Sequence, residues 1–197
     1  AAFCLTEPEA GSDAASVKTH ATLDGDEYVL NGEKLWITNG GIAQFFTVFA
    51  KTSGPNDKKA QMTAFIVTSD MEGISIGPHE DKMGLRASST TTVAFDNVRV
   101  PKENVLGEYG QGFKVAMKIL NSGRTGLGGG SVGVMKKCIE LSTKQAKERK
   151  QFGQPIASFG LIKQKIGQMV VDCYAAEACV SLVASLTDEG YEDYQVE

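Results

Sequence analysis

The sequence predicts an α+β protein in which an antiparallel β-barrel or sandwich is followed by helices of an incomplete bundle. Two observations carry this prediction. Up to about residue 106, short runs of aromatic and β-branched residues alternate with turn residues. From Phe113 onward, apolar residues recur with the spacing of an α-helix. We therefore expect a β-domain over residues 1–106 and two bundle helices over residues 107–197.

Several strands are expected in the first part. The runs QFFTVFAKT, MTAFIVTSD and TTTVAFDNVRV are rich in β-branched and aromatic residues, and turn residues bound each of them. In EYVLNGEKLWITNG, the dipeptide Asn31-Gly32 lies between two alternating runs, which predicts a hairpin at that point. The segment SGPNDKK, residues 53–59, is typical of a surface turn.

Two helices are expected in the second part. The first begins near Phe113 and contains the glycine-rich stretch RTGLGGGSVG. Each glycine weakens an isolated helix by about 1 kcal/mol relative to alanine. Tertiary packing must therefore hold the helix there, or the helix is broken. The second helix, from about residue 161 to 186, has apolar groups on more than one side, which indicates burial in a bundle.

The composition disfavours several functional classes. The 197 residues carry a net charge of −4 and no basic run, so nucleic acid is not an expected partner. No apolar run approaches the roughly 18 residues that cross a bilayer, so no transmembrane segment is expected. The four cysteines lack C-x-x-C spacing and the chain has two histidines, so we expect no metal site. Free thiols are favoured over disulfides, although pairing in a secreted protein stays open.

Two turns carry groups suited to a flat heteroaromatic ligand. The segments CLTEP and LWITNGG each end a strand and offer hydroxyls and free backbone N–H groups, with Trp36 beside one of them. Such a set would place donors and acceptors around a planar ring, with an aromatic wall on one side. The same residues also fit two ordinary turns with a core tryptophan. The residues alone leave both interpretations open.

Five motifs decide between these interpretations. The stretches FCLTEPEAGSD, NGEKLWITNGG, KMGLRASSTTTVAFDNVRVPKENVLG, GFKVAMKILNSGR and ERKQFG occur in the order and spacing of the acyl-CoA dehydrogenase family. The chain resembles that family over essentially its whole length, and AFCLTEP, GSDAAS and ILNSGR resemble its very-long-chain branch. The family fold has an N-terminal helical domain, a middle β-domain and a C-terminal four-helix bundle. This sequence resembles the flavin- and acyl-CoA-binding middle domain and the first two bundle helices, with the N-terminal domain absent, so both ends look truncated.

The resemblance implies a flavoenzyme of fatty acid β-oxidation. Such an enzyme uses FAD to convert a fatty acyl-CoA thioester to the trans-2-enoyl-CoA, and it passes the electrons to an electron-transfer flavoprotein. The family also implies a homodimer or homotetramer in the mitochondrial matrix or the bacterial cytoplasm. Two alternatives stay open: an acyl-CoA oxidase, in which oxygen reoxidises the flavin, and a non-catalytic assembly or binding partner of the same family.

The resemblance assigns cofactor contacts to three segments. Thr38 would place its hydroxyl near flavin N5, and Trp36 would flank the isoalloxazine ring. A third segment, around Arg149, would reach the FAD of a neighbouring subunit. The full set of expected cofactor-binding residues is Phe3, Cys4, Leu5, Thr6, Ser12, Trp36, Ile37, Thr38, Arg149, Gln151 and Phe152.

The resemblance also assigns residues to the substrate, with Arg124 close to the thioester end of the cleft. The expected substrate-binding residues are Ser12, Asn121, Ser122, Gly123 and Arg124. The glycines that follow, such as Gly128 and Gly130, would leave room for a long acyl chain.

The catalytic base has no candidate in this sequence. One branch of the family carries its glutamate directly before the helix arginine, where this chain has Gly123. The other members carry it on a later loop, so we expect the base beyond Glu197 and no activity from this fragment alone. We interpret Glu7 as structural, and Glu9, His20 and His79 as surface residues.

Overall fold

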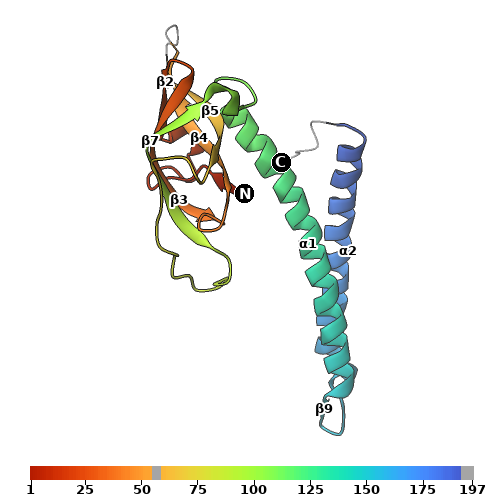
Figure 1. Cartoon of the computed structure of the whole chain (residues 1–197). Helices are drawn as coiled ribbons and strands as arrows, with labels where there is room; N and C mark the ends of the chain where they lie inside the picture. The colour runs from red at the N-terminus through yellow and green to blue at the C-terminus, as the bar shows by residue number, and fades with distance from the viewer. Residues whose placement is uncertain (55–58, 192–197) are drawn as a thin grey trace. The chain divides into compact units, whose positions relative to one another are not determined.

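The computed structural model of the chain describes residues 1–54 and 59–191, which fall into two compact units, residues 1–118 and 119–197 (Figure 1). The first unit contains the main sheet and the second contains two long helical segments. Residues 55–58 of the predicted surface turn lie outside the described residues.

The first unit is built on one curved, mixed sheet. Its strands, in chain order, are β1 (Ala2–Cys4), β2 (His20–Asp24), β3 (Glu27–Thr38), β4 (Phe45–Thr52), β5 (Gln61–Thr68), β6 (Ile74–Ile76), β7 (Thr90–Pro101) and β8 (Val105–Leu106). They are arranged in the order β6-β7-β3-β2-β4-β5-β8, with β1 paired to β4. Most pairs are antiparallel, as the sequence predicts, but β1 and β2 run parallel to β4.

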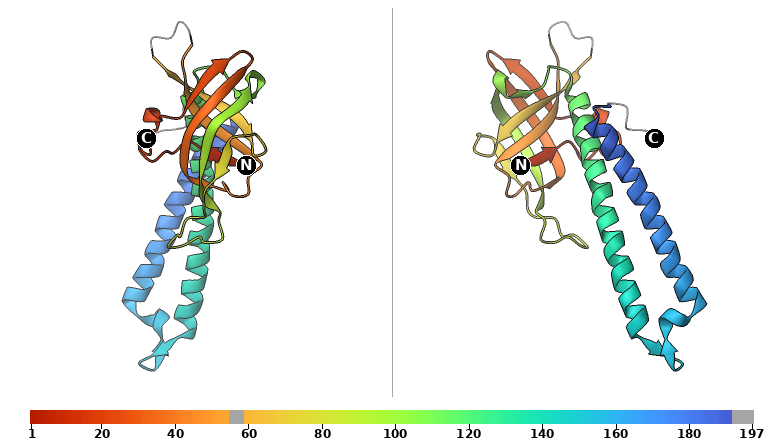
Figure 2. Two further views of the ribbon diagram at one scale, coloured as in Figure 1. Left: turned by 60° about the vertical axis from the view of Figure 1, so that its left-hand side comes forward. Right: turned by 90° about the vertical axis from the view of Figure 1, so that its right-hand side faces the viewer.

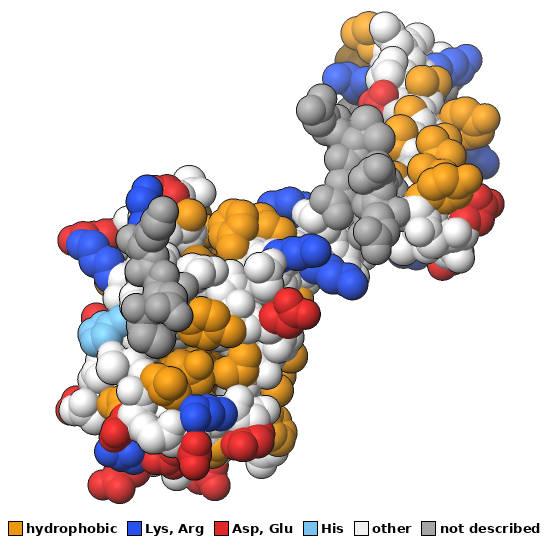
Figure 3. Space-filling view, turned by 90° about the horizontal axis from the view of Figure 1, so that it is seen from above, with side chains coloured by type: hydrophobic (Ala, Val, Ile, Leu, Met, Phe, Trp, Pro, Cys, Tyr) orange, Lys and Arg blue, Asp and Glu red, His pale blue; other side chains and the backbone are white. Residues whose placement is uncertain are grey.

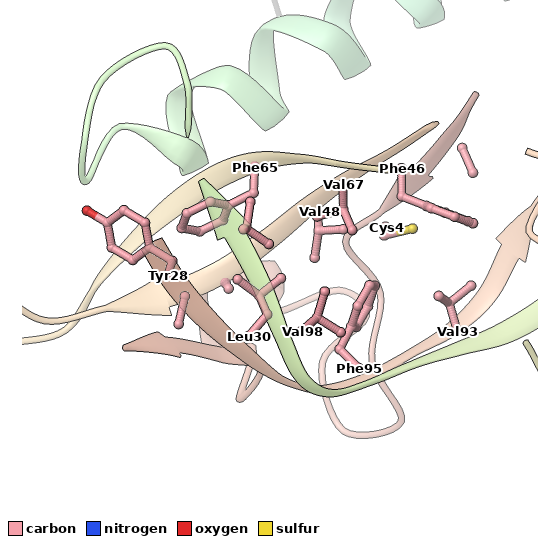
Figure 4. Close-up of a cluster of buried hydrophobic side chains, with 14 of the residues drawn as sticks. Cys4, Tyr28, Leu30, Phe46, Val48, Phe65, Val67, Val93, Phe95 and Val98 are labelled. Atoms are coloured by element: carbon pink, nitrogen blue, oxygen red, sulfur yellow. The ribbon is translucent and has the colours of Figure 1, made fainter. Parts of the chain in front are cut away.

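The hydrophobic core of this unit lies between the two sides of the curved sheet. Figure 4 shows side chains from β3 and β7 facing those from β4 and β5. The rings of Tyr28 and Phe65 meet edge to face, with their centroids 5.1 Å apart. Burying a large apolar side chain of this kind contributes about 1.5–3 kcal/mol. Several such residues are completely buried: Leu30, Val48, Phe65, Val67, Val93 and Val98.

The predicted hairpin at Asn31-Gly32 is wrong. Strand β3 runs unbroken through this dipeptide, and the β2–β3 hairpin turns earlier, at Gly25, where Asp24 pairs with Glu27. Gly32 instead lies at a shift in the β3–β7 register. A Cβ atom at Gly32 would lie 2.7 Å from the Cα of Thr19. The glycine is therefore required by a close approach of two backbones and not by a turn.

Both expected helices are present. Helix α1 spans Gly112–Glu148, and α2 spans Gly160–Asp188, close to the predicted range. A short hairpin of β9 (Lys150–Gln151) and β10 (Gln154–Pro155) connects them, followed by a 3₁₀ turn at Ile156–Ser158. Helix α1 continues through the glycine-rich stretch, so of the two alternatives the unbroken helix is correct. In the second unit the two helices lie side by side (Figure 2).

The helices of the second unit leave many apolar side chains exposed, and Figure 3 shows such side chains gathered on the surface. In the described part of the chain, α2 is long and apolar enough to meet the length and composition test for a membrane span. Length and composition alone do not show a span, because an interior helix of a helical bundle has the same properties, and the absence of a transmembrane segment stays a prediction. Apolar groups on several sides of α2 indicate such a bundle helix.

Candidate functional site

The first group of candidate residues lies at the break between two strands that pair with the same side of β4. Strands β1 and β2 follow one another along the same edge of β4, opposite residues 46–48 and 51–52. The loop of residues 5–19 leaves the sheet between them. At its start, the carbonyl oxygen of Thr6 accepts a hydrogen bond of 2.9 Å from the N–H of Leu35. The structure thus brings residues 3–6 beside residues 36–38, the two segments that the sequence assigns to the cofactor.

Trp36 occupies a bulge in β3. Lys34 pairs with Val93 and Ile37 pairs with Thr91, so two residues of β3 oppose the single Thr92. Trp36 has a φ of 56° and is 63% exposed. A bulky residue in this left-handed conformation costs about 1–3 kcal/mol and points to a function. The bulge turns the indole outward, so the alternative of a core tryptophan is wrong.

The turn after β3 is tied to the segment before β7. Thr38 is the exposed last residue of β3 and pairs with Thr90. The N–H of Asn39 donates to the carbonyl of Ser89 at 2.8 Å, and the N–H of Gly41 donates to the Ser89 hydroxyl at 3.2 Å. The Thr38 hydroxyl is therefore carried by a strand whose end is held in place.

The remaining candidates of this group differ in accessibility. Phe3 is half-buried and packs on Phe49, with ring centroids 5.0 Å apart, while Ser12 is exposed. The side chains of Cys4 and Ile37 belong to the core, being 0% and 2% exposed. Burial raises the pKa of Cys4 to about 12, so its thiol is neutral and unreactive. Any contact that these two residues make with a surface ligand would come from main-chain atoms.

A buried ion pair lies beneath the start of the loop, and sequence reasoning missed half of it. The ammonium nitrogen of Lys34 lies 2.7 Å from Oε1 of Glu7, with side chains 0% and 5% exposed. Lys34 also donates to the carbonyl of Leu5 at 3.2 Å. The sequence predicts a structural role for Glu7 but does not single out Lys34. The available signal was its place in β3, where counting every second residue from buried Tyr28 reaches Lys34.

The Glu7 carboxylate is an anchor and is poorly suited to be a catalytic base. Burial acts to raise its pKa, but hydrogen bonds from Lys18, Lys34 and Thr19 outweigh burial and hold the pKa below its usual value. The backbone N–H groups of Lys18 and Thr19 donate to it at 2.5 and 3.0 Å. Glu9, by contrast, is exposed and pairs with the Lys18 side chain at the surface.

In the second unit, the candidate substrate residues lie on α1. The guanidinium of Arg124 donates to the side-chain oxygen of Asn121 at 2.9 Å, and the Arg124 side chain is exposed. Ser122 lines a cavity of about 200 Å³ between α1 and α2. The other lining residues are Thr125, Gly126, Ala184, Thr187 and Asp188.

The third group of candidates lies at the hairpin that connects the helices. The carbonyl of Arg149 accepts a 2.8 Å hydrogen bond from the N–H of Ile156. Phe152 has a φ of 52°, is 93% exposed and contacts Phe159 edge to face. At 1.5 Å per residue, Arg124 lies roughly 36 Å along the helix axis from Glu148, where α1 ends. The structure therefore keeps the groups around Arg124 and Arg149 apart within one chain.

Gly128 and Gly130 have different surroundings. A large side chain at these positions could overpack the helices or could fill the room for an acyl chain, and comparing the two positions separates these effects. A Cβ at Gly128 would lie 3.0 Å from Val180 of α2, whereas a Cβ at Gly130 has nothing within 4 Å among the described residues. We expect Gly128→Leu to lower the free energy of unfolding by about 1–3 kcal/mol through overpacking. Gly130→Leu should not, so it is the variant that tests whether these glycines make room for an acyl chain. Chemical denaturation of both variants checks this; equal losses would contradict it.

The described part of the chain contains no group of three or more metal-ligating side chains. All four cysteines lie in that part and are free thiols. His20 and His79 are exposed, as expected.

Comparison with known proteins matches both units to one family. The model "Acyl-CoA dehydrogenase, middle domain" matches residues 2–98, and "Acyl-CoA dehydrogenase, C-terminal domain" matches residues 110–197. The chain therefore belongs to the acyl-CoA dehydrogenase family of oxidoreductases.

The chain is similar to individual members of this family. The chain is 50% identical to the human mitochondrial very long-chain specific acyl-CoA dehydrogenase, an alignment that covers 100% of this chain and 31% of that protein. Among solved structures, it is similar to butyryl-CoA dehydrogenase from Megasphaera elsdenii, with a TM-score of 0.90 and 40% identity over 98% of this chain and 50% of that chain. It is also similar to an acyl-CoA dehydrogenase from Bacillus anthracis complexed with FAD, with a TM-score of 0.85 and 47% identity over 98% and 33% of the two chains. The chain spans about a third of the length of its curated very-long-chain relatives.

Proposed function

We propose that this chain is part of an enzyme that uses FAD to oxidise fatty acyl-CoA thioesters to trans-2-enoyl-CoA and passes the electrons to an electron-transfer flavoprotein. The observation that carries the proposal is the outward-facing Trp36, held in a strained conformation beside Thr6 and Thr38. FAD, when bound, supplies the acceptor for the hydride that leaves the β-carbon. The FAD complex of the Bacillus anthracis relative supports the cofactor.

The residues of the first unit would bind and orient the flavin. Trp36 would form a wall beside the isoalloxazine ring, and Thr6 would bind its pyrimidine edge. Thr38 would donate a hydrogen bond near N5, which favours the electron-rich reduced ring. Ser12, on the exposed loop, would contact both the cofactor and the acyl-CoA.

Residues of the second unit would bind the substrate and the cofactor at two separate places. Asn121, Ser122, Gly123 and Arg124 would lie near the thioester end of the substrate. Arg149, Gln151 and Phe152 would bind the FAD of another subunit, Arg149 through a planar charged group suited to a pyrophosphate. The long separation between Arg124 and Arg149 along α1 supports this division and a homodimer or homotetramer.

The remaining parts of the proposal concern the whole protein. The catalytic glutamate would come from a segment beyond Glu197, and the middle domain would end near residue 106. Relatives include a human mitochondrial enzyme and bacterial enzymes, which supports the mitochondrial matrix or the bacterial cytoplasm.

Spectroscopy of the purified protein tests this function. The intact mass shows how long the whole protein is, and its visible spectrum should show the bands of bound oxidised flavin. Anaerobic addition of acyl-CoAs of graded length should bleach those bands. Bound flavin that no acyl-CoA bleaches would favour the non-catalytic partner. Bleaching followed by rapid reoxidation on admission of oxygen would favour an acyl-CoA oxidase.

The role of Trp36 gives a separate prediction. Trp36→Ala should raise the Kd for FAD about tenfold, because an aromatic contact is worth about 0.5–1.5 kcal/mol beyond its buried area. Trp36→Phe should retain most of the affinity. Titration of the apoprotein with FAD measures both. Leu23→Ala, which removes an exposed apolar side chain on β2, is the control and should leave the Kd unchanged.

A further inference from the structure

We propose that the buried Lys34–Glu7 pair is a positioning device that holds the flavin-facing ends of β1 and β3 together, an inference that rests on the function proposed above. Lys34 comes from β3 and Glu7 from the loop after β1. Their charged groups lie 2.7 Å apart, and Lys34 also donates to the carbonyl of Leu5 at 3.2 Å. The pair therefore fixes the peptide group that directly precedes Thr6.

A second hydrogen bond acts beside the first. The N–H of Leu35 donates to the carbonyl of Thr6 at 2.9 Å. Two consecutive carbonyls of the loop, those of Leu5 and Thr6, are thus held by two consecutive residues of β3. A segment held at adjacent carbonyls cannot rotate the peptide between them, and the half-exposed Thr6 side chain keeps one direction.

Lys34, as one member of the ion pair, also affects the direction in which the bulge at Trp36 opens. The bulge lies between two inward-facing residues, Lys34 at 0% and Ile37 at 2% exposure. Between them, the N–H of Leu35 is directed to the loop. Because both ends of the bulge face inward, the extra residue leaves the pleat on the outer side, and this places Trp36 at the surface.

An apolar pair would fill the same space without these directional contacts. Glu7 accepts from Lys34 and from the N–H groups of Lys18 and Thr19, and Lys34 adds the contact to Leu5. Hydrogen bonds have preferred distances and angles, whereas hydrophobic contact is non-directional. The ion pair therefore specifies one arrangement of residues 5–7, residues 18–19 and Lys34.

The experiment compares Lys34→Met with the double variant Glu7→Gln/Lys34→Met. The double variant leaves no unpaired buried charge, so it keeps the test valid if the single variant misfolds. Protein labelled with 5-fluorotryptophan reports the surroundings of Trp36 by ¹⁹F NMR in the apoprotein, with the resonance assigned by Trp36→Phe. FAD titration of each apoprotein gives the Kd. All measurements are made at a temperature where circular dichroism shows the variant to be folded.

We expect the double variant to shift or broaden the Trp36 resonance and to raise the Kd for FAD at least tenfold. Lys102→Met, which removes an exposed pair with Asp26, should change neither quantity. A folded double variant with the wild-type resonance and Kd would overturn the inference. If wild-type apoprotein fails to bind FAD, the proposed function fails, while the ¹⁹F comparison still decides whether the pair positions Trp36.

Discussion

Lys34→Met is expected to lower the free energy of unfolding by about 3–5 kcal/mol. The substitution leaves the Glu7 carboxylate buried without its cation and removes the donor to the carbonyl of Leu5. Urea denaturation at neutral pH measures the loss. Lys102→Met is the matched control, since its pair with Asp26 is exposed and contributes little.

A double-mutant cycle separates the ion pair from other effects of the substitution. The Glu7→Gln/Lys34→Met variant should recover much of the lost stability, because replacing a buried pair by neutral groups is often close to neutral. A double variant as unstable as the sum of its single variants would show that the two side chains do not interact.

The pair should also make stability depend on pH on the acid side. The folded-state pKa of Glu7 lies below its ordinary value of 4.5, so folding favours the ionised form. Its stabilisation is present above about pH 4.5 and is lost as the pH falls through the lowered folded-state pKa. Denaturation of wild type and of the double variant at neutral and acid pH should therefore show the steeper acid loss in the wild type.

Phe65→Ala should be comparably damaging, with an expected loss of about 3–5 kcal/mol. Phe65 is 0% exposed, and its ring contacts that of Tyr28, so the substitution leaves a cavity in the middle of the sheet core. Thermal or urea unfolding measures the effect.

Ile66→Ala, at the next position of β5, provides the comparison. Ile66 points to the other face of the strand and is 38% exposed, so its loss should be clearly smaller. Equal losses at the two positions would contradict the assignment of the core to the face that carries Phe65.

Local sequence patterns predicted the elements better than their details. The alternating runs in β4, β5 and β7 and the helical spacing in α1 and α2 identify those elements, because burial of one face imposes a period on the sequence. The dipeptide Asn31-Gly32 misled the prediction because glycine is required both in tight turns and where two backbones meet. The close approach of Thr19, which makes the glycine necessary, involves a residue of the loop before β2.

For the candidate site too, the sequence predicted the segments but not their geometry. Residue types and motifs indicated the segments around Thr6, Trp36 and Arg149, and the family assignment that they implied is confirmed. The sequence did not reveal that Trp36 lies in an outward bulge or that Lys34 is buried against Glu7. The first depends on the register between β3 and β7, and the second depends on contacts between β3 and the loop that follows β1.

The sequence by itself determined the family, the change from β-structure to helix near residue 112, and the segments that carry the candidate site. These properties follow from residue types and periods that are readable within short windows. Only the tertiary structure decided that β1 and β2 share one edge of β4, that the loop leaves between them, and that Lys34 and Glu7 meet beneath it. The physical reason is that strand register and the partner of a buried charge are set by residues distant in the chain, which no local pattern encodes.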